Sequence, residues 1–228
     1  MTEADPGETI TLEWRSSGGT QAWLNYLLPT YQYGCSWEVA PTGSMEYAIP
    51  AANRNWERFE LSVSDDAGRN ARSGLAVALH CPDTWFFSPA PDECPSNPPI
   101  LTDGAEVHFE RGFMLWNKAE DRIYVLFNDR PYPDWQAFTD QWDEGQPESD
   151  PSIEPPAGLY QPVRGFGLLW REQLGVRGRL GWAVDTEVGY PMAIQRTSRF
   201  KYNDTYVKAL DGGVWKLGPE GSRWRHIP

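Results

Sequence analysis

The sequence predicts a mainly β protein with an all-β N-terminal part and an α+β C-terminal part. Three observations carry this prediction. Apolar and polar residues alternate in several short runs, a proline-dense segment divides the chain, and one hairpin-like pattern occurs twice. With 228 residues, 40% of them hydrophobic, the chain is long enough for one large domain or two ordinary ones.

Residues 8–81 carry the alternation of half-buried strands. The run 9–14 reads TITLEW, and the run 59–79 has two alternating stretches around a polar turn at 65–70. The pattern F-x-L-x-V-x-D-x-x-G followed by L-x-V resembles the last hairpin of bacterial immunoglobulin-like sandwich domains. The opening PGETITLEW resembles early strands of the same fold. The resemblance implies an immunoglobulin-like β-sandwich over 8–81 and leaves function open, because that fold hosts adhesion, spacing and ligand binding.

Residues 82–105 form a predicted linker that is dense in proline. A segment of this composition is extended and semi-rigid. Its prolines are Pro82, Pro89, Pro91, Pro95, Pro98 and Pro99.

The remaining residues, 106–228, contain the repeated pattern. Residues 109–126 read FERGFMLWNKAEDRIYVL and residues 200–217 read FKYNDTYVKALDGGVWKL. At a constant offset of 91 residues (200 − 109), Leu115 aligns with Tyr206 and Tyr124 with Trp215. Each copy predicts a β-hairpin, and one such unit cannot bury its apolar face alone. We therefore expect a duplicated β-hairpin domain with helices packed on it.

Two helices are predicted between the hairpins. Trp135, Phe138 and Trp142 fall at i, i+3 and i+7, the spacing of one face of a short amphipathic helix. A second set with helical spacing covers 166–173 and ends near Gly175.

The segment after the second predicted helix carries a further resemblance. Leu180-Gly181-Trp182-Ala183, followed by Glu187, Gln195 and Phe200, resembles the LGFP-type repeat of bacterial envelope proteins, with Ala183 in place of the family's proline. The resemblance implies a role in binding the cell envelope.

The three cysteines suggest two disulfide pairings. A Cys81–Cys94 disulfide would clamp a proline-rich loop and stabilise it by roughly 2–4 kcal/mol. A Cys35–Cys81 bond across a sandwich would leave Cys94 free. We expect the first pairing and a secreted or cell-surface protein. The N-terminus has no basic segment followed by an apolar stretch, so we expect a native signal or anchor to have been removed.

The net charge and the absence of known catalytic motifs disfavour several classes of function. A net charge of −12 disfavours nucleic acid and anionic membranes as partners. No apolar run reaches the length of a membrane helix, which predicts no direct membrane insertion. His80, His108 and His226 are isolated, and no nucleophile, zinc, Walker or dinucleotide motif is present, so we expect neither metal nor cofactor.

Carboxylates leave one enzymatic alternative. Glycoside hydrolysis needs two of them about 5–9 Å apart around a sugar, and the acidic clusters also allow calcium as a lesser alternative. The candidates are Asp140, Asp143, Glu144, Glu148, Asp150, Glu154, Glu172 and Glu187.

Aromatic residues make up 14% of the chain. Most of these rings are expected in the core, and exposed rings would stack on the apolar faces of sugars. Tyr124 and Trp215 hold matching positions opposite aliphatic neighbours and are predicted surface rings, and Trp182 and Tyr190 precede the second hairpin. The favoured function is a non-enzymatic surface module that binds a glycan or cell wall, or presents a protein-binding face. The alternatives are a glycoside hydrolase and a structural subunit of an extracellular assembly.

Overall fold

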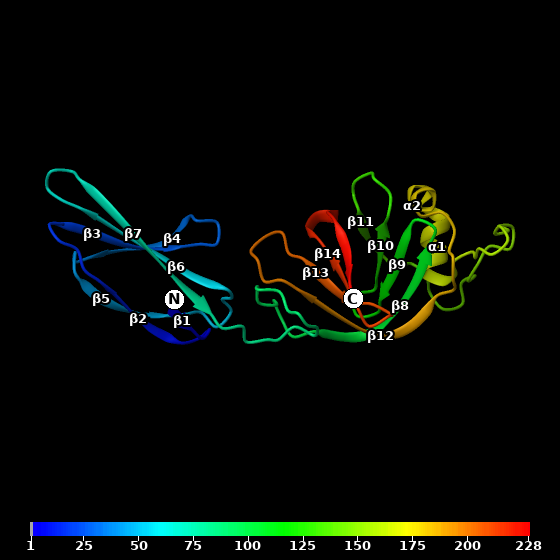
Figure 1. Ribbon diagram of the computed structural model, residues 1–228, viewed down its shortest axis with the longest axis horizontal. Helices are drawn as coiled ribbons and strands as arrows, with labels where there is room; N and C mark the ends of the chain where they lie inside the picture. The colour runs from blue at the N-terminus through cyan, green and yellow to red at the C-terminus, as the bar shows by residue number, and fades with distance from the viewer. Residues whose placement is uncertain (1) are drawn as a thin grey trace. The chain divides into compact units, whose positions relative to one another are not determined.

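The computed structural model describes residues 2–228, and strands dominate it, with 44% strand and 8% helix. This confirms the prediction of a mainly β protein. The chain divides into two compact units (Figure 1). The N-terminal unit contains the residues up to Trp85, with Pro89–Asn97 and Ser198–Lys201. The C-terminal unit contains Phe86–Ser88, Pro98–Thr197 and Tyr202–Pro228.

The N-terminal unit consists of two sheets. The larger sheet has the order β1 (Thr2–Ala4), β7 (Asn70–Leu79), β6 (Trp56–Ser64), β3 (Gln21–Leu27) and β4 (Tyr33–Val39). The smaller sheet pairs β2 (Thr9–Trp14) with β5 (Gly43–Ala48). The β1–β7 pair is parallel and the others are antiparallel. The hairpin predicted over 59–79 is confirmed, since β6 pairs directly with β7.

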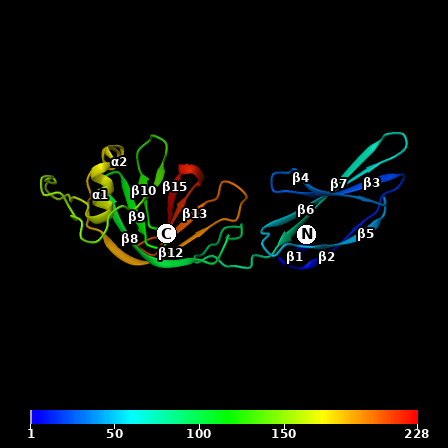
Figure 2. The same ribbon diagram turned by 180° about the vertical axis from the view of Figure 1, so that it is seen from behind.

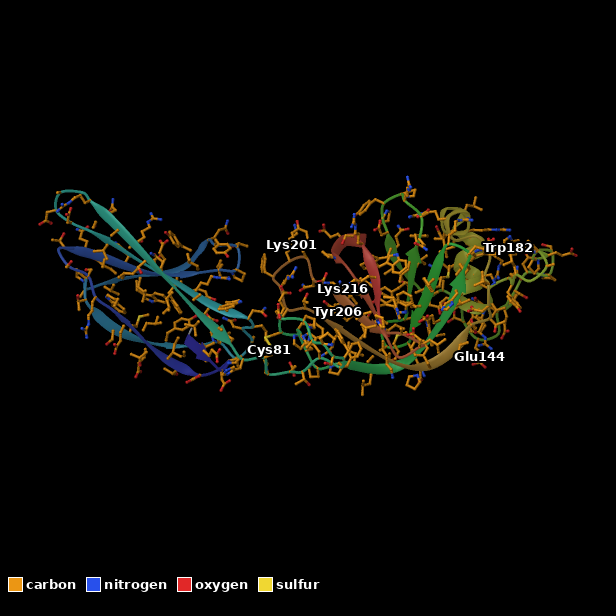
Figure 3. All side chains as sticks on the ribbon, viewed as in Figure 1. Cys81, Glu144, Trp182, Lys201, Tyr206 and Lys216 are labelled. Carbon is orange, nitrogen blue, oxygen red and sulfur yellow. A yellow bond between two sulfur atoms is a disulfide. The ribbon has the colours of Figure 1, made fainter. Side chains whose placement is uncertain are left out.

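The core of this unit lies between the two sheets. Leu12 of β2 packs with Leu24 of β3, Phe59 of β6 and Val77 of β7, all of them buried. Figure 3 shows side chains filling the space between the sheets. The alternation in the sequence therefore arises because each sheet has one apolar face directed at the other, which is the arrangement of a β-sandwich.

The disulfide joins Cys81 to Cys94, with 5.1 Å between the Cα atoms. This confirms the expected pairing and excludes the Cys35–Cys81 alternative. Cys35 is a free, exposed thiol on β4. The backbone N–H of Cys94 donates to Asn55 Oδ1 at 2.9 Å, and the Ser198 hydroxyl donates to the Cys94 carbonyl oxygen at 2.9 Å. The covalent bond and these hydrogen bonds together hold the loop in place.

The C-terminal unit is built on one antiparallel sheet of eight strands. Their order is β11 (Trp135–Thr139), β10 (Arg122–Phe127), β9 (Gly112–Asn117), β8 (Ile100–Phe109), β12 (Val188–Arg196), β13 (Thr205–Lys208), β14 (Val214–Leu217) and β15 (Trp224–Ile227). The sheet curls into a nearly closed barrel. Trp224 Nε1 donates to the Phe127 carbonyl oxygen and Trp135 Nε1 to the Gly218 carbonyl oxygen, both at 2.8 Å, and these bonds link the two edges.

The curled sheet packs against a hydrophobic core on each of its faces. Leu115, Tyr124 and Trp215 belong to the core inside the barrel. On the outer face, α1 (Arg164–Glu172) and α2 (Leu174–Leu180) pack over β8, β9 and β10 (Figure 2). The short 3₁₀ turn η1 (Pro219–Gly221) precedes β15. The helix predicted over 166–173 is confirmed as α1, and none of the helices within residues 2–228 has both the length and the apolarity to span a membrane.

The two repeated segments are both hairpins, but their registers differ. Tyr124 pairs with Leu115, whereas Trp215 pairs with Val207. The turn covers 118–121 in the first hairpin and 209–213 in the second, which is one residue longer. The constant offset therefore aligns the second strands only. Tyr206, the aligned counterpart of Leu115, contacts Phe87 and Lys216 instead (Figure 3).

Two local predictions are wrong. The residues predicted as a helix at Trp135 and Phe138 form strand β11, and Trp142 lies in the irregular segment after it. The strand β8 begins at Ile100, inside the segment 82–105 that the prolines suggested as linker.

Candidate functional site

The C-terminal unit has a cleft of about 810 Å³ beside the first turn of α1. We call it the acidic cleft. Strands β8, β9, β10 and β12, the segment 140–148 and the start of α1 contribute its walls. It is lined by Asp103, Gly104, Ala105, Trp116, Ile123, Asp140, Trp142, Glu144, Glu148, Arg164, Gly165, Phe166, Glu187, Gly189, Tyr190 and Pro191. It therefore brings together segments far apart in the sequence.

One cation organises part of the wall. The Arg164 guanidinium contacts Glu148 Oε1 at 3.2 Å and Glu187 Oε1 at 2.9 Å, and the Arg164 backbone N–H donates to the Glu148 carbonyl oxygen. Arg164 has a positive φ of 51° at the start of α1. This turn of the backbone begins the helix and fixes the segment around Glu148 against β12 at the same time.

A second carboxylate, Asp140, lies against the first turn of α1. Its Oδ1 accepts the backbone N–H of Trp142 at 3.0 Å. A Cβ at Gly165 would lie 2.4 Å from Asp140 Oδ1, so only glycine allows this close approach. Asp140 forms no ion pair with any residue between 2 and 228. The carboxyl group is thus held in place by backbone contacts without a compensating cation.

Burial shifts both of these acids toward the protonated form. Loss of solvent raises the pKa of Asp140, and the nearby negative charges of Asp121 and Asp143 raise it further. Burial also raises the pKa of Glu187, although Arg164 opposes that shift, and the charges of Glu148 and Asp140 add to it. The cleft therefore contains two electrostatically coupled carboxyl groups that hold protons more readily than free side chains do.

The raised pKa of Asp140 predicts a pH-dependent stability. Above its ordinary value of 3.8, the native state retains a proton that the unfolded chain has already released. The buried charge therefore destabilises the C-terminal unit as the pH rises through the folded-state pKa. We expect wild-type protein to lose stability relative to Asp140→Asn as the pH rises from the ordinary value of 3.8 through the raised folded-state pKa. Urea unfolding at a series of pH values above 4 checks the prediction, and a flat difference, matching that of the control Glu154→Gln, an exposed acid outside the cleft, would contradict it.

Aromatic residues provide the other functional groups of the cleft. The indole Nε1 atoms of Trp116 and Trp142 are both buried, and neither has a hydrogen-bond partner in the described chain. Phe166 and Tyr190 complete the aromatic lining. Unpaired buried donors are uncommon in proteins and call for an explanation. A ligand oxygen that enters the cleft could accept these N–H groups.

The predicted surface rings Tyr124 and Trp215 do not lie on the surface. Their exposed fractions are 3% and 4%, and both belong to the barrel interior. The Tyr124 hydroxyl donates to Glu120, and Trp215 Nε1 donates to Glu106 Oε2 at 3.0 Å. The prediction of exposed stacking rings at these positions is therefore wrong, because the side of the strand opposite its aliphatic neighbours is a second core.

The two other predicted rings lie in separate places. Trp182 is partly buried against Trp170, with 5.0 Å between ring centroids, and lines a different hollow of about 430 Å³. Tyr190 lines the acidic cleft, and its hydroxyl donates to the Lys208 carbonyl oxygen at 2.9 Å. Of the four predicted ligand-binding residues, Tyr190 alone contributes to the cleft.

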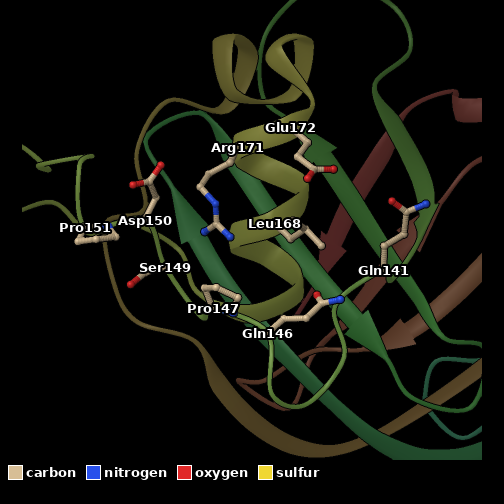
Figure 4. A pocket seen from close by; sticks show the side chains of 9 residues that line it. All are labelled: Gln141, Gln146, Pro147, Ser149, Asp150, Pro151, Leu168, Arg171 and Glu172. Carbon is tan, nitrogen blue, oxygen red and sulfur yellow. The ribbon is translucent and has the colours of Figure 1, made fainter.

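The eight predicted carboxylates divide among several sites. Four of them, Asp140, Glu144, Glu148 and Glu187, line the acidic cleft. Asp150 and Glu172 line a neighbouring hollow of about 630 Å³ between α1 and the preceding loop (Figure 4). Hydrogen bonds from Ser152 lower the pKa of Asp150, which keeps it ionised and closes a turn. Asp143 and Glu154 line neither hollow.

Sequence reasoning missed three important residues of the cleft. Trp116 lies in the first hairpin next to Leu115, which belongs to the barrel core. Because successive strand residues point to opposite faces, this position was the sequence signal that Trp116 lies on the other face of the sheet. Trp142 was assigned to a helix, and Arg164 belongs to no motif. Within residues 2–228, no group of three or more His, Cys, Asp or Glu side chains could hold a metal ion.

Comparison with protein-family models, with curated proteins and with solved structures finds no match to this chain.

Proposed function

We propose that this protein is a glycan-binding module of a secreted or cell-surface protein and that the acidic cleft is its binding site. The observation that carries the proposal is the combination of aromatic rings, unpaired indole N–H donors and carboxylate acceptors in one cleft. A saccharide offers an apolar ring face and hydroxyl groups that both donate and accept hydrogen bonds. Pockets of this volume with a few convergent polar groups are typical ligand sites.

The N-terminal unit supports an extracellular setting. A structural disulfide favours an oxidising compartment. The strands β2 to β7 can be assigned to strands B, C, C′, E, F and G of an immunoglobulin-like domain. That assignment places C, F and G in one sheet and B with E in the other, as the observed strand order requires. We infer an immunoglobulin-like sandwich for the N-terminal unit and a duplicated hairpin within the C-terminal unit.

The resemblance to LGFP-type repeats makes a cell-envelope polymer the preferred source of the glycan. Leu180 is fully buried in the core under α1 and α2, and Trp182 packs against that core. The Trp182 backbone N–H donates a hydrogen bond to Glu110 Oε2 at 2.9 Å, so this group already has a partner within the protein. The segment therefore supports the unit around the cleft and leaves ligand contact to the cleft residues.

A second candidate function is glycoside hydrolysis in the same cleft. The specific observation that favours it is that two carboxyl groups with different surroundings share the cleft, since a catalytic acid must hold a proton that a second group has released. Burial raises the pKa of Asp140, which has no ion-pair partner among residues 2–228, whereas Glu187 pairs with Arg164 at 2.9 Å. Formation of new reducing ends from a bound glycan, lost in Asp140→Asn and in Glu187→Gln, would favour the enzyme over the binding module.

A glycan array tests the binding proposal with two different changes to the cleft. Trp142→Ala removes a ring and a donor. Gly189→Leu fills the cleft from β12, where a Cβ would meet only the Gly104 carbonyl oxygen at 3.7 Å. We expect each variant to weaken binding at least about tenfold, because the first removes an aromatic anchor and the second occupies space that the ligand needs.

The matched control is Trp23→Ala, which removes an exposed tryptophan of the N-terminal unit. It should bind like the wild type. If intact protein retains no glycan, or if both cleft variants bind as well as intact protein, the acidic cleft is not a glycan site. A protein-binding face or a structural subunit would then be the better account.

A further inference from the structure

The charges of the acidic cleft are unbalanced. Five carboxylates, those of Asp103, Asp140, Glu144, Glu148 and Glu187, face one guanidinium, that of Arg164. Lys118 pairs with Asp103 at 2.9 Å, and Arg164 is shared between Glu148 and Glu187. Asp140 and Glu144 form no ion pair with any described residue. Two carboxylates are thus left without a positive partner from the protein itself.

The surroundings of Asp140 sharpen this imbalance. Asp140 is partly buried beside the first turn of α1, and the charges of Asp121 and Asp143 act on it as like charges. The cation of the cleft, Arg164, is engaged by Glu148 and Glu187 instead. Coulomb attraction to a ligand cation is stronger in such a partly desolvated position than in open water. A positive group that enters the cleft would therefore relieve repulsion that the fold leaves in place.

The unpaired indole groups place a second, independent requirement on the ligand. The side chains of Trp116 and Trp142 line the cleft, and their indole Nε1 atoms are buried donors that lack an acceptor oxygen. A simple cation cannot satisfy them. The faces of tryptophan rings also attract organic cations. The ligand should therefore carry a positive charge and hydroxyl or ring oxygens within one small unit.

We propose that the acidic cleft selects glycans with free, protonated amino groups, that is, N-deacetylated amino sugars. The inference rests on the proposed function, because it names the class of glycan that the same site takes. N-acetylation removes the charge that the unpaired carboxylates attract and adds bulk at the same position. The N-acetylated form of the same sugar is therefore the matched comparison for the free amine.

Titration calorimetry with two tetrasaccharides tests the inference. One is a glucosamine tetramer with all amines free and the other is its fully N-acetylated counterpart, both measured at a pH near 6. We expect the free amine to bind at least about tenfold more tightly. This preference should shrink at high salt, because screening weakens attraction between charges.

Two variants locate the preference. Glu144→Gln changes an exposed cleft carboxylate with little risk to folding, and Asp140→Asn neutralises the partly buried one. Each should reduce the preference for the free amine by several fold. The control Glu154→Gln, an exposed acid outside the cleft, should leave it unchanged. An unchanged preference in both cleft variants would overturn the assignment of charge recognition to this site.

The remaining outcomes separate this inference from the proposed function. Equal binding of the two tetrasaccharides would overturn the selection of amines and leave glycan binding in place. Binding of neither tetrasaccharide, together with an array that retains other glycans, would also overturn the selection of amines. An array that retains nothing would remove the proposed function itself. If a trilysine peptide binds as tightly as the glucosamine tetramer, the cleft recognises charge alone, and the inference fails.

Discussion

Replacing Trp215 by alanine should lower the unfolding free energy of the C-terminal unit by about 3–5 kcal/mol, as for other buried tryptophans. Trp215 is 4% exposed inside the barrel and packs against Phe113 and Trp224, with ring centroids 4.6 and 5.5 Å away. Its indole N–H also donates to the buried carboxylate of Glu106. The substitution removes a large core side chain and one donor of a buried charge at the same time. Urea unfolding monitored by circular dichroism measures the loss.

Two controls separate these contributions. Trp215→Phe keeps most of the ring but loses the donor to Glu106, so it should cost about 1–3 kcal/mol. Trp23→Ala removes an exposed ring and should leave this transition unchanged. If Trp215→Ala kept full stability and lost glycan binding, Trp215 would be a ligand contact and its assignment to the barrel core would be wrong.

Loss of the disulfide should have the second large effect. Cys81 and Cys94 close a loop with a sequence separation of 13, and for a loop near this length the chain-entropy estimate is about 3 kcal/mol. The double variant Cys81→Ser/Cys94→Ser should therefore unfold at lower urea concentration in the transition of the N-terminal unit. The Asn55 and Ser198 contacts to Cys94 should weaken with it, because they depend on the position of this loop.

The free thiol provides the control for this experiment. Cys35→Ser alters an exposed cysteine on β4 that forms no disulfide and should leave the stability unchanged. Reduction of wild-type protein should reproduce the effect of the double variant. A double variant as stable as the wild type would show that the fold holds this loop without the covalent bond.

Hydrophobic patterns in the sequence correctly predicted the strands and helices that have one buried side and one solvent-facing side. The hairpin of β6 and β7 has one face toward the sandwich core and one toward solvent, so its alternation is readable from sequence. The helix α1 likewise has one buried side, with Phe166 and Trp170 in the core. Cys81 and Cys94 are close in sequence, and the residues between them form neither helix nor strand. In each of these cases the local sequence contains the physical cause.

The same rules fail for strands that pack against a core on both faces. Trp135 points into the barrel core and Phe138 packs in the outer core under α1. Apolar residues therefore occur on both faces of β11, and their i, i+3 spacing is also the spacing expected on one face of a helix. The surface prediction for Tyr124 fails for the same reason, because the barrel interior is a second apolar environment opposite Ile123 and Val125.

The acidic cleft could be predicted only in part. Half of the carboxylates that the sequence suggested line it, since 140–148 is an acidic segment in its own right. Trp116 and Arg164 come to the cleft from β9 and from the start of α1. Their proximity depends on how the sheet curls and where α1 packs on it. No local pattern in the sequence contains that information.

The indole N–H signals in a ¹H–¹⁵N spectrum test the central claim most directly. During titration with the best glycan from the array, the signals of Trp116 and Trp142 should shift, because the ligand accepts hydrogen bonds from donors that have no partner in the free protein. The signals of Trp170 and Trp215 should stay in place, since those N–H groups already donate to the Gly181 carbonyl oxygen and to Glu106. A titration that leaves Trp116 and Trp142 unchanged while other tryptophan signals shift would contradict the assignment of the acidic cleft as the binding site.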